Sequence, residues 1–322
     1  MNDHESPRMP LVCIILLNWN QRQLTADCLK SLHSVTHPPF QVVLVDNAST
    51  DDSVAFVREH YPEVVILENR ENLGFSEGNN VGIRYALAQG ADYLLLLNND
   101  TEVAPDFLAE LFAVADSASD IGIVGPKMYY YDQPQTIWCA GNKVIWPMGH
   151  TIRLQAEEQE MTSRSHEAPQ PVDFITACAL LIKREVVDKV GILDARYFIY
   201  FDEADWCLAA KEIGYRVLYV PTARIWHKVS ASMGATSPAT DYYMDRNSLL
   251  FVGKRRRGLR KWYSLLLIMG RHLLTVAAYT IKPHGGQRIP NRNARLLALR
   301  DALLGRWGKM GPDVAAVCYP DR

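Results

Sequence analysis

The first 73 residues contain no glycine, and the first glycine of the chain is Gly74. Dinucleotide-binding and P-loop proteins place a glycine-rich turn, G-x-G-x-x-G or G-x-x-x-x-G-K-[ST], after their first strand so that backbone amides can approach phosphates. Its absence makes dehydrogenases and P-loop enzymes poor candidates. The six cysteines are never closer than 15 positions, so the chain has no CxxC zinc motif and no dense disulfide framework. We therefore expect a reduced, cytoplasmic setting.

Long apolar runs are also missing. No uninterrupted apolar stretch reaches about 18 residues, the usual length of a membrane span. The polar segment Met1–Pro10 leads into only seven apolar residues, Leu11–Leu17, which is not typical of a signal peptide. With 48% hydrophobic and 22% charged residues, the composition is that of a globular protein, which excludes disorder, collagen and coiled coil for the whole chain.

The formal net charge of −2 hides an uneven distribution of charge. Residues 253–322 hold 15 Lys and Arg against three Asp, a charge of +12, and residues 1–252 hold 19 basic against 33 acidic residues, a charge of −14. Six of the basic residues lie within Lys254–Lys261. We therefore expect a body of residues 1–252, with halves 1–125 and 126–252, and a basic tail of residues 253–322.

Apolar, β-rich runs alternate with segments of helical apolar spacing in the first half. Near-continuous apolar runs indicate strands buried on both faces, and the alternation predicts a mainly parallel sheet with helices on both faces. Ligands of such a sheet bind at the carboxyl ends of its strands. The expected strands are 11–17, 41–45, 64–67 and 93–97, and the expected helices are 23–34, 51–60, 76–89 and 105–116.

The second half is less regular. Residues 150–173 have few apolar side chains and predict a mobile loop, such as a lid. Further elements are expected after this loop. They are an apolar segment at 174–183, helices at 185–190 and 202–213, a strand at 216–220 and a separate strand that ends at His227.

The tail contains a segment, Trp262–Ile281, that resembles a membrane span except for Arg271 and His272 at its centre. At about 100° per residue its polar side chains fall on one narrow stripe of a helix, and the other faces are almost wholly apolar. Such a helix, flanked by Trp and basic residues, lies in a membrane interface more readily than it spans the membrane. The stripe comprises Arg257, Ser264, Arg271, Thr275 and Lys282.

Polar side chains follow three of the expected strands. Asn18 ends the first strand, and Asp46 ends the second, where its carboxylate can accept hydrogen bonds from a base N–H or from ribose hydroxyls. Asn98, Asn99 and Asp100 end the fourth, where one carboxylate beside amide oxygens suits Mg²⁺ or Mn²⁺ completed by a diphosphate. A turn or helix cap is the structural alternative for both Asp46 and Asp100.

Two further segments carry candidate chemistry. Residues 72–82 bring three glycines and three asparagines to a helix start, where backbone amides favour anions. Residues 201–206 place three carboxylates at another helix start beside Phe and Trp. They either satisfy the helix dipole or raise one another's proton affinity, as a general base near neutral pH requires. His227, by itself, is more often structural than a metal ligand.

Taken in order, these segments resemble the family 2 glycosyltransferases, specifically the bacterial rhamnosyltransferase-like branch that builds surface polysaccharides. The resemblance extends from residue 14 to residue 254, about four fifths of the chain. It departs from the family at Glu203, where Asp is more frequent, at Ala209, where Arg is common, and at Asn98, which brings no charge to a metal. The matching stretches are ILLNWN, VVLVDNASTDDS, ENLGFSEGNNVGI, LLLLNNDTEVAPDFL, FDEADWCLAAKEIGYRVLYVP, IWH and YYMDRNSLLFVGK.

The resemblance implies a GT-A fold, an α/β class with a Rossmann-like sheet, here followed by a helical, membrane-associating tail. It implies an inverting, metal-dependent enzyme that transfers rhamnose or a similar sugar from a dTDP- or UDP-linked donor to a glycan or lipid-linked glycan. Glu203 would be the base, flanked by Asp202 and Asp205, and Arg246 would meet the departing diphosphate. The metal ligands would be Asp100 and His227. The nucleotide-sugar site would comprise Asn18, Asp46, Asn72, Gly74, Gly78, Asn79 and Asn99.

Other functions remain open from the sequence. A nucleotidyltransferase has a related sheet but usually carries a Gly-rich loop after the first strand, and a noncatalytic, membrane-docked scaffold would keep the fold without turnover. Nucleic acid is not an expected partner, because the basic residues of the tail alternate with long aliphatic stretches. We expect residues 254–282 to bind anionic lipid on the inner face of the cell membrane, which would make the protein cytoplasmic and peripheral.

Overall fold

The apolar runs of the first half form the centre of a ten-stranded mixed sheet, in a computed structural model that describes residues 9–35, 38–160, 168–229, 237–281 and 288–320. The strand order is β10-β12-β6-β11-β4-β1-β2-β3, with β5 beside β12 and β7 beside β6. Strands β4, β1, β2 and β3 are mutually parallel, and β11 is antiparallel to both of its neighbours. The predicted α/β class is confirmed. The first-half strands are β1 (Val12–Asn18), β2 (Phe40–Asp46), β3 (Val65–Glu68), β4 (Tyr93–Asn98), β5 (Thr101–Val103) and β6 (Ile121–Tyr130).

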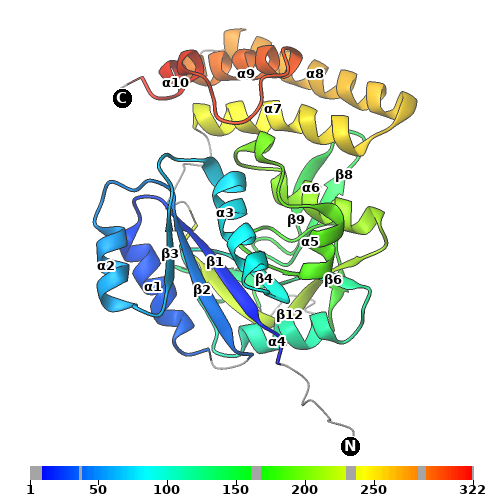
Figure 1. Cartoon of the computed structure of the whole chain (residues 1–322). Coiled ribbons are helices and arrows are strands. Elements are labelled where there is room, and N and C mark those ends of the chain that lie inside the picture. The colour runs from blue at the N-terminus through cyan, green and yellow to red at the C-terminus, as the bar shows by residue number, and fades with distance from the viewer. Residues whose placement is uncertain (1–8, 36–37, 161–167, 230–236, 282–287, 321–322) are drawn as a thin grey trace, which may run out of the picture.

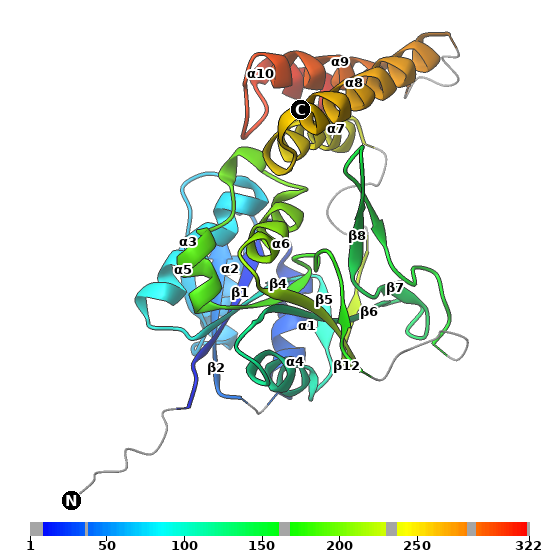
Figure 2. The ribbon, with the colours of Figure 1, turned by 90° about the vertical axis from the view of Figure 1, so that its right-hand side faces the viewer.

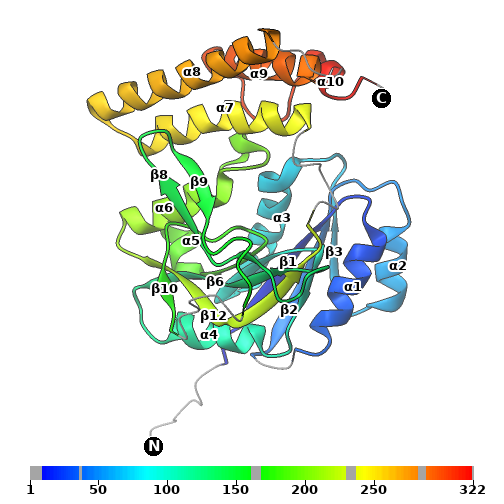
Figure 3. The same ribbon diagram turned by 180° about the vertical axis from the view of Figure 1, so that it is seen from behind.

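Helices cover both faces of this sheet, as predicted. The connections from β1 to β2 and from β2 to β3 advance in one direction, whereas the connection from β3 to β4 returns. Right-handed crossovers therefore place α3 on the face opposite α1 and α2 (Figures 1 and 3). The first-half helices are α1 (Arg22–Leu32), α2 (Ser53–His60), α3 (Gly74–Ala88) and α4 (Phe107–Asp116).

The second half differs from prediction in two places. The strand expected at 216–220 and the one expected to end at His227 are a single strand, β12, with a register irregularity between Val220 and Arg224 against β6. The expected loop at 150–173 begins as a β-hairpin with β8, although its residues 161–167 lie outside the described residues. The remaining elements are β7 (Ile137–Cys139), β8 (Asn142–Ile145), β9 (His150–Arg153), β10 (Gln170–Pro171), β11 (Ala179–Lys183), α5 (Arg184–Val190), the 3-10 helix η1 (Ala195–Tyr197), α6 (Asp202–Glu212) and β12 (Arg216–His227).

Side-chain contacts hold the segment after this hairpin in place. The nearly buried Lys127 donates to Glu160 Oε1 at 2.9 Å, and the Tyr129 hydroxyl donates to Glu160 Oε2 at 2.8 Å. Gln159 Nε2 donates to the hydroxyl of Thr136 at 2.8 Å. Up to residue 160, therefore, the segment is anchored to β6 and β7, and the prediction of a mobile loop is wrong there.

Four helices form a separate layer above the carboxyl ends of β1–β4 (Figures 1 and 2). The longest, α8, contacts both α7 and α9, and α7 also contacts η1 and α6. Helix α7 runs across residue 252, the boundary expected between the body and the tail. The helices are α7 (Pro238–Arg255), α8 (Gly258–Ile281), α9 (Arg288–Leu303) and α10 (Pro312–Cys318).

Helix α8 meets the protein with a side that includes part of the predicted polar stripe. Ser264, Ile268 and His272 form its buried face, and His272 Nδ1 lies 3.2 Å from Asp245 Oδ1 on α7. Within the polar stripe, Ser264 thus faces the protein, whereas Arg271 is exposed. Lys282 lies outside the described residues. The apolar side of α8 is left at the surface.

A buried ion-pair network fastens α9 to α7. Arg295 Nη2 lies 2.6 Å from Asp241 Oδ1, and Arg295 Nη1 lies 2.7 Å from Asp245 Oδ2. Both carboxylates are largely buried, so neither is well solvated without its partner. The guanidinium therefore compensates two charges at the base of the helical layer.

We predict that Arg295→Leu lowers the free energy of unfolding by about 3 kcal/mol, because it leaves two buried carboxylates without a counter-charge. The measurement is urea denaturation followed by circular dichroism. Arg58→Leu is the matched control, since its pair with Glu68 is exposed and is expected to contribute less than about 1 kcal/mol. Equal effects of the two substitutions would contradict this description of the network.

Candidate active site

Asn18 joins three elements at the carboxyl edge of the sheet. Its buried side chain donates to Asp46 Oδ1 at 2.8 Å and to Ser49 Oγ at 3.0 Å. Its Oδ1 accepts from the Thr25 hydroxyl at 2.9 Å and from Asn99 Nδ2 at 3.3 Å. The structure therefore brings together Asn18, Asp46 and Asn99, three of the predicted nucleotide-sugar residues.

The turn after β2 uses Asp46 as well. Asp46 Oδ2 accepts from the backbone N–H of Ser49 at 2.8 Å, and Ala48 between them has a φ of 62°, in the left-handed region. Asp46 is therefore part of the turn, and its predicted contact with a nucleotide base is an additional role that remains a prediction.

Asn47, which sequence reasoning missed, organises the predicted loop that starts at Asn72. Asn47 Nδ2 donates to Asn72 Oδ1 at 3.1 Å and to the Gly74 carbonyl at 3.0 Å, and Asn47 Oδ1 accepts from the N–H of Leu73 at 3.0 Å. Its position directly after Asp46 in a strand-end motif was the available signal.

The glycines of α3 are packed against protein. A Cβ on Gly74, whose φ is +80°, would lie 2.4 Å from the Phe198 ring, and one on Gly78 would lie 2.7 Å from Leu17 Cδ1. Asn79 Nδ2 is bonded to the Phe75 carbonyl in the preceding turn of the same helix. These positions let α3 approach β1 and the segment before α6. That the loop also brings backbone amides to a nucleotide sugar stays a prediction.

Asp100 and His227 meet at the ends of β4 and β12. Asp100 Oδ1 lies 3.2 Å from His227 Nε2, and both side chains are largely buried. Asp100 Oδ1 and His227 Nδ1 are nevertheless buried without a hydrogen bond. No group of three or more His, Cys, Asp or Glu that could hold a metal occurs within the described ranges. Two protein ligands with an unsatisfied oxygen fit a hard cation that keeps waters and binds a diphosphate.

Asp202 and Glu203 begin α6 in surroundings that raise the pKa of both carboxyl groups. Asp202 is fully buried and accepts from the Ser76 hydroxyl at 2.9 Å. Burial raises the pKa of Asp202, and burial followed by the charge of Asp202 raises the pKa of Glu203 well above its usual range. A carboxyl group with a raised pKa is what general base catalysis near neutral pH uses. Ser76 was not predicted as a site residue, although it lies in the predicted loop.

The backbone before this pair is strained. Phe198, Tyr200 and Phe201 have φ values of 67°, 68° and 71°, which residues other than glycine rarely adopt. Such strain persists only where surrounding contacts impose it, and it concentrates at functional sites. The segment 198–201 therefore needs an external support to position Asp202 and Glu203.

Arg246 and Asn247 on α7 provide that support. Asn247 Nδ2 donates to the carbonyls of Tyr197 at 2.8 Å and Ile199 at 2.7 Å, and Arg246 Nη2 donates to the Tyr197 carbonyl at 3.3 Å. Arg246 is 1% exposed, and its guanidinium faces the Tyr242 ring at 5.0 Å. Protein therefore encloses Arg246, and its predicted contact with the departing diphosphate stays a prediction.

Asp205 is bonded to α7. It forms ion pairs with Lys254 and Arg255, and Arg255 Nη1 also lies 3.0 Å from Glu212 Oε2. Asp205 therefore fixes α6 to α7, and its predicted role beside the base stays a prediction. Lys254 and Arg255, two residues of the basic cluster Lys254–Lys261, are consequently engaged in ion pairs within the protein.

Comparisons with known proteins agree with this arrangement. A mannosyltransferase from Pyrobaculum calidifontis in complex with GDP-Man and Mn²⁺ superposes with a TM-score of 0.57 over 93% of this chain and 89% of its own, at 15% identity. TarS from S. aureus in complex with UDP-GlcNAc gives a TM-score of 0.58 over 95% of this chain and 83% of its own, also at 15% identity. The fold is therefore GT-A.

The model of the family described as glycosyl transferase family 2 matches residues 13–191, which is more than half of the chain. The chain belongs to this family. This membership decides against the nucleotidyltransferase alternative.

The curated relatives include rhamnosyltransferases. N-acetylglucosaminyl-diphospho-decaprenol L-rhamnosyltransferase of Mycobacterium tuberculosis is 26% identical over 71% of this chain and 80% of its own. The dTDP-rhamnosyl transferase RfbF of Shigella flexneri is 23% identical over 66% of this chain and 71% of its own. An uncharacterized protein, y4gI, of Sinorhizobium fredii is 30% identical over 70% of this chain, and the match spans only a quarter of that protein.

We predict that Asn247→Ala slows sugar transfer at least about tenfold, because the carbonyls of the strained segment lose their donor and Glu203 is displaced. The unpaired carbonyls are also expected to lower the free energy of unfolding by about 2 kcal/mol. Initial rates and urea denaturation measure the two effects. Asn293→Ala on α9 is the control, and a rate for Asn247→Ala equal to that of this control would contradict the prediction.

Proposed function

We propose that this family 2 enzyme transfers rhamnose or a similar hexose, with inversion, from a dTDP- or UDP-linked donor to a hydroxyl of a glycan or lipid-linked glycan in surface polysaccharide synthesis. The observation that carries the proposal is the pair of neighbouring carboxyl groups at the start of α6, the buried Asp202 and the half-buried Glu203, which α7 holds in place. The strand-end residues Asn18, Asp46 and Asn99 would bind the nucleotide sugar.

The number of acid–base groups follows from the leaving group. A glycosidase needs two carboxyl groups because its leaving oxygen must be protonated. A nucleoside diphosphate leaves without protonation, so one base that deprotonates the acceptor hydroxyl is enough. Attack on the face opposite the diphosphate inverts the anomeric carbon. Glu203 would be that base, with Asp202 raising its proton affinity.

Asp100 and His227 would hold a divalent cation, Mg²⁺ or Mn²⁺. The cation would supply Lewis-acid stabilisation of the leaving diphosphate. The unsatisfied oxygen of Asp100 and the approach of His227 Nε2 to it support this assignment. The mannosyltransferase from Pyrobaculum calidifontis, which shares the fold, is described in complex with Mn²⁺.

Helix α8 would dock the enzyme on the inner face of the cell membrane. Within the described part of the chain, α8 is the helix whose length and apolar composition would allow it to span a membrane. Its contacts with α7 through Ser264 and His272 favour a position along the surface instead. The exposed side is here named the apolar face of α8. It comprises Leu259, Trp262, Tyr263, Leu266, Leu273, Leu274 and Ile281.

We predict that Glu203→Gln abolishes transfer while donor binding stays nearly intact, because the amide cannot accept the acceptor proton. In the unmodified enzyme the rate should rise with pH as Glu203 loses its proton, and the raised pKa places this rise above the usual range of a glutamate. Rates from pH 4 to 9 and nucleotide titrations measure both properties. Near-normal turnover of the variant would refute the base assignment, and transfer by the unmodified enzyme excludes a noncatalytic scaffold.

For Asp100→Ala we predict loss of metal-dependent donor binding, since one of two protein ligands is removed. Calorimetry with dTDP and UDP, with and without Mn²⁺, measures the effect. Asp106→Ala, an exposed carboxylate at the start of α4, is the control. Unchanged metal-dependent binding by Asp100→Ala would place the cation elsewhere.

The double variant Leu266→Ser/Leu274→Ser should bind liposomes roughly 100-fold more weakly, because two exposed leucines no longer enter the bilayer. Sedimentation with vesicles of phosphatidylcholine and phosphatidylglycerol measures the partition. Ile213→Ser, which removes an exposed apolar side chain from the body, should change nothing. Undiminished sedimentation of the double variant would show that the apolar face of α8 is not the membrane contact.

A further inference from the structure

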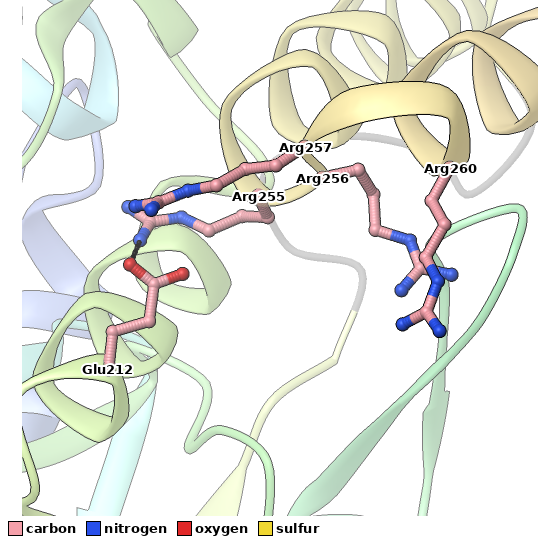
Figure 4. A pocket seen from close by; sticks show the side chains of 5 residues that line it. All are labelled: Glu212, Arg255, Arg256, Arg257 and Arg260. Carbon is pink, nitrogen blue, oxygen red and sulfur yellow. Dashed lines mark hydrogen bonds and ion pairs between the residues drawn. The ribbon is translucent and has the colours of Figure 1, made fainter.

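Four arginines lie where α7 ends and α8 begins, with their side chains in two pairs (Figure 4). They line a cavity of about 530 Å³, to which Glu212 contributes the one carboxylate (Figure 4). Figure 4 shows Arg255 and Arg257 extending over α6, and Arg256 and Arg260 extending toward the β8–β9 side. We name this cavity the arginine pocket. Its residues are Glu212, Arg255, Arg256, Arg257 and Arg260.

Protein groups neutralise only one of these guanidinium groups. Arg255 is paired with Asp205 and Glu212. Arg256 stacks over Trp146 at 4.3 Å, and its buried Nε has no hydrogen-bond partner.

Arg257 and Arg260 add two further positive charges to the arginine pocket. Among the residues that the structure describes, neither side chain has an ion pair or a hydrogen bond, and both residues are exposed. With Arg256 they form three uncompensated positive charges at one concave surface. Such mutual repulsion is relieved by an anion that carries more than one charge.

The position of the pocket indicates where such an anion comes from. Leu259 and Trp262, which flank Arg260 in sequence, are 88% and 64% exposed and begin the apolar face of α8. On its other side the pocket reaches Glu212 on α6. Glu203 lies nine residues earlier on the same helix, about 14 Å along its axis. An anion in the pocket would lie between a lipid surface and the base.

We propose that the arginine pocket binds the diphosphate of a lipid-linked acceptor, whose lipid chain lies along the apolar face of α8 and whose sugar extends toward Glu203. This inference rests on the proposed function and names its acceptor class. Guanidinium groups bind phosphate oxygens in bidentate pairs, so several of them match a diphosphate better than the single phosphate of a phospholipid. A relative of this chain is named for a diphospho-decaprenol substrate.

The test uses the full-length protein and farnesyl diphosphate, a soluble lipid diphosphate, titrated by calorimetry in EDTA so that metal-dependent binding at Asp100 is suppressed. We expect saturable binding that weakens at least about tenfold in the double variant Arg257→Gln/Arg260→Gln, because two charge-assisted contacts are lost. Arg306→Gln, which removes another exposed tail charge, should bind as the unmodified protein does. Equal affinity of the double variant and the unmodified protein would overturn the proposal.

A second arm separates the diphosphate from general surface charge. Two kinds of phosphatidylcholine vesicle with equal negative charge are compared. In the first kind undecaprenyl diphosphate supplies the charge, and in the second kind phosphatidylglycerol supplies it. The double variant should lose its preference for the first vesicles and keep its binding to the second. Equal loss on both would show that the pocket senses only anionic lipid, which overturns the proposal.

A third measurement keeps this inference separate from the proposed function. Binding of dTDP or UDP with Mn²⁺ by the double variant should be unchanged, which shows that the donor site is intact. Failure of the unmodified enzyme to transfer any sugar would refute the proposed function. The titrations with farnesyl diphosphate would still decide whether the pocket binds a lipid diphosphate.

Discussion

The hydrogen bonds from Asn247 and Arg246 to the carbonyls before α6 are the interaction on which the site depends. They hold Phe198, Tyr200 and Phe201 in left-handed backbone conformations that these residues would not adopt unaided. This conformation starts α6 at Asp202, whose carboxylate accepts from the Ser76 hydroxyl on α3. The helical layer is therefore needed to build the site.

The same layer couples the site to the proposed membrane contact. Helix α7 begins near the strained segment, carries Arg246 and Asn247, and ends in the basic cluster that pairs with α6 through Asp205. Helix α8 packs on it with Ser264 and His272 and leaves its apolar side exposed. An enzyme that acts on a lipid-linked acceptor must place its base at a fixed height above the bilayer. A rigid connection between α6, α7 and α8 would do this.

Much of the fold could be predicted from the sequence, because buried parallel strands and amphipathic helices leave strong periodic signals. The strands that end at Asn18, at Asp46 and just before Asp100 lie within a residue or two of the predicted bounds. The irregular strand β12 was divided in two, because a β-bulge interrupts its apolar pattern. The side of α8 that packs against the protein was not predictable, since periodicity defines the faces of a helix and does not say which face meets protein.

The site was predictable at the level of motifs, and less so for individual side chains. Asp100 and His227 do meet, as do Asn18, Asp46 and Asn99. The contacts of Arg246 and Asp205 inside the protein were not predictable, because sequence does not distinguish a charge that faces a cleft from one buried against another helix. Asn47, Ser76 and Asn247 were not predicted, because their roles lie in contacts between segments far apart in the chain.

The central claim is that a single buried carboxyl pair serves as base for attack opposite a nucleoside diphosphate. The most direct test is to incubate the enzyme with dTDP-β-L-rhamnose or a UDP-α-hexose and a lipid-linked acceptor, and to determine the anomeric configuration of the first product by NMR. The account predicts a product with the configuration opposite to that of the donor. A product that retains the donor configuration would contradict it, because retention requires a second chemical step that one base does not provide.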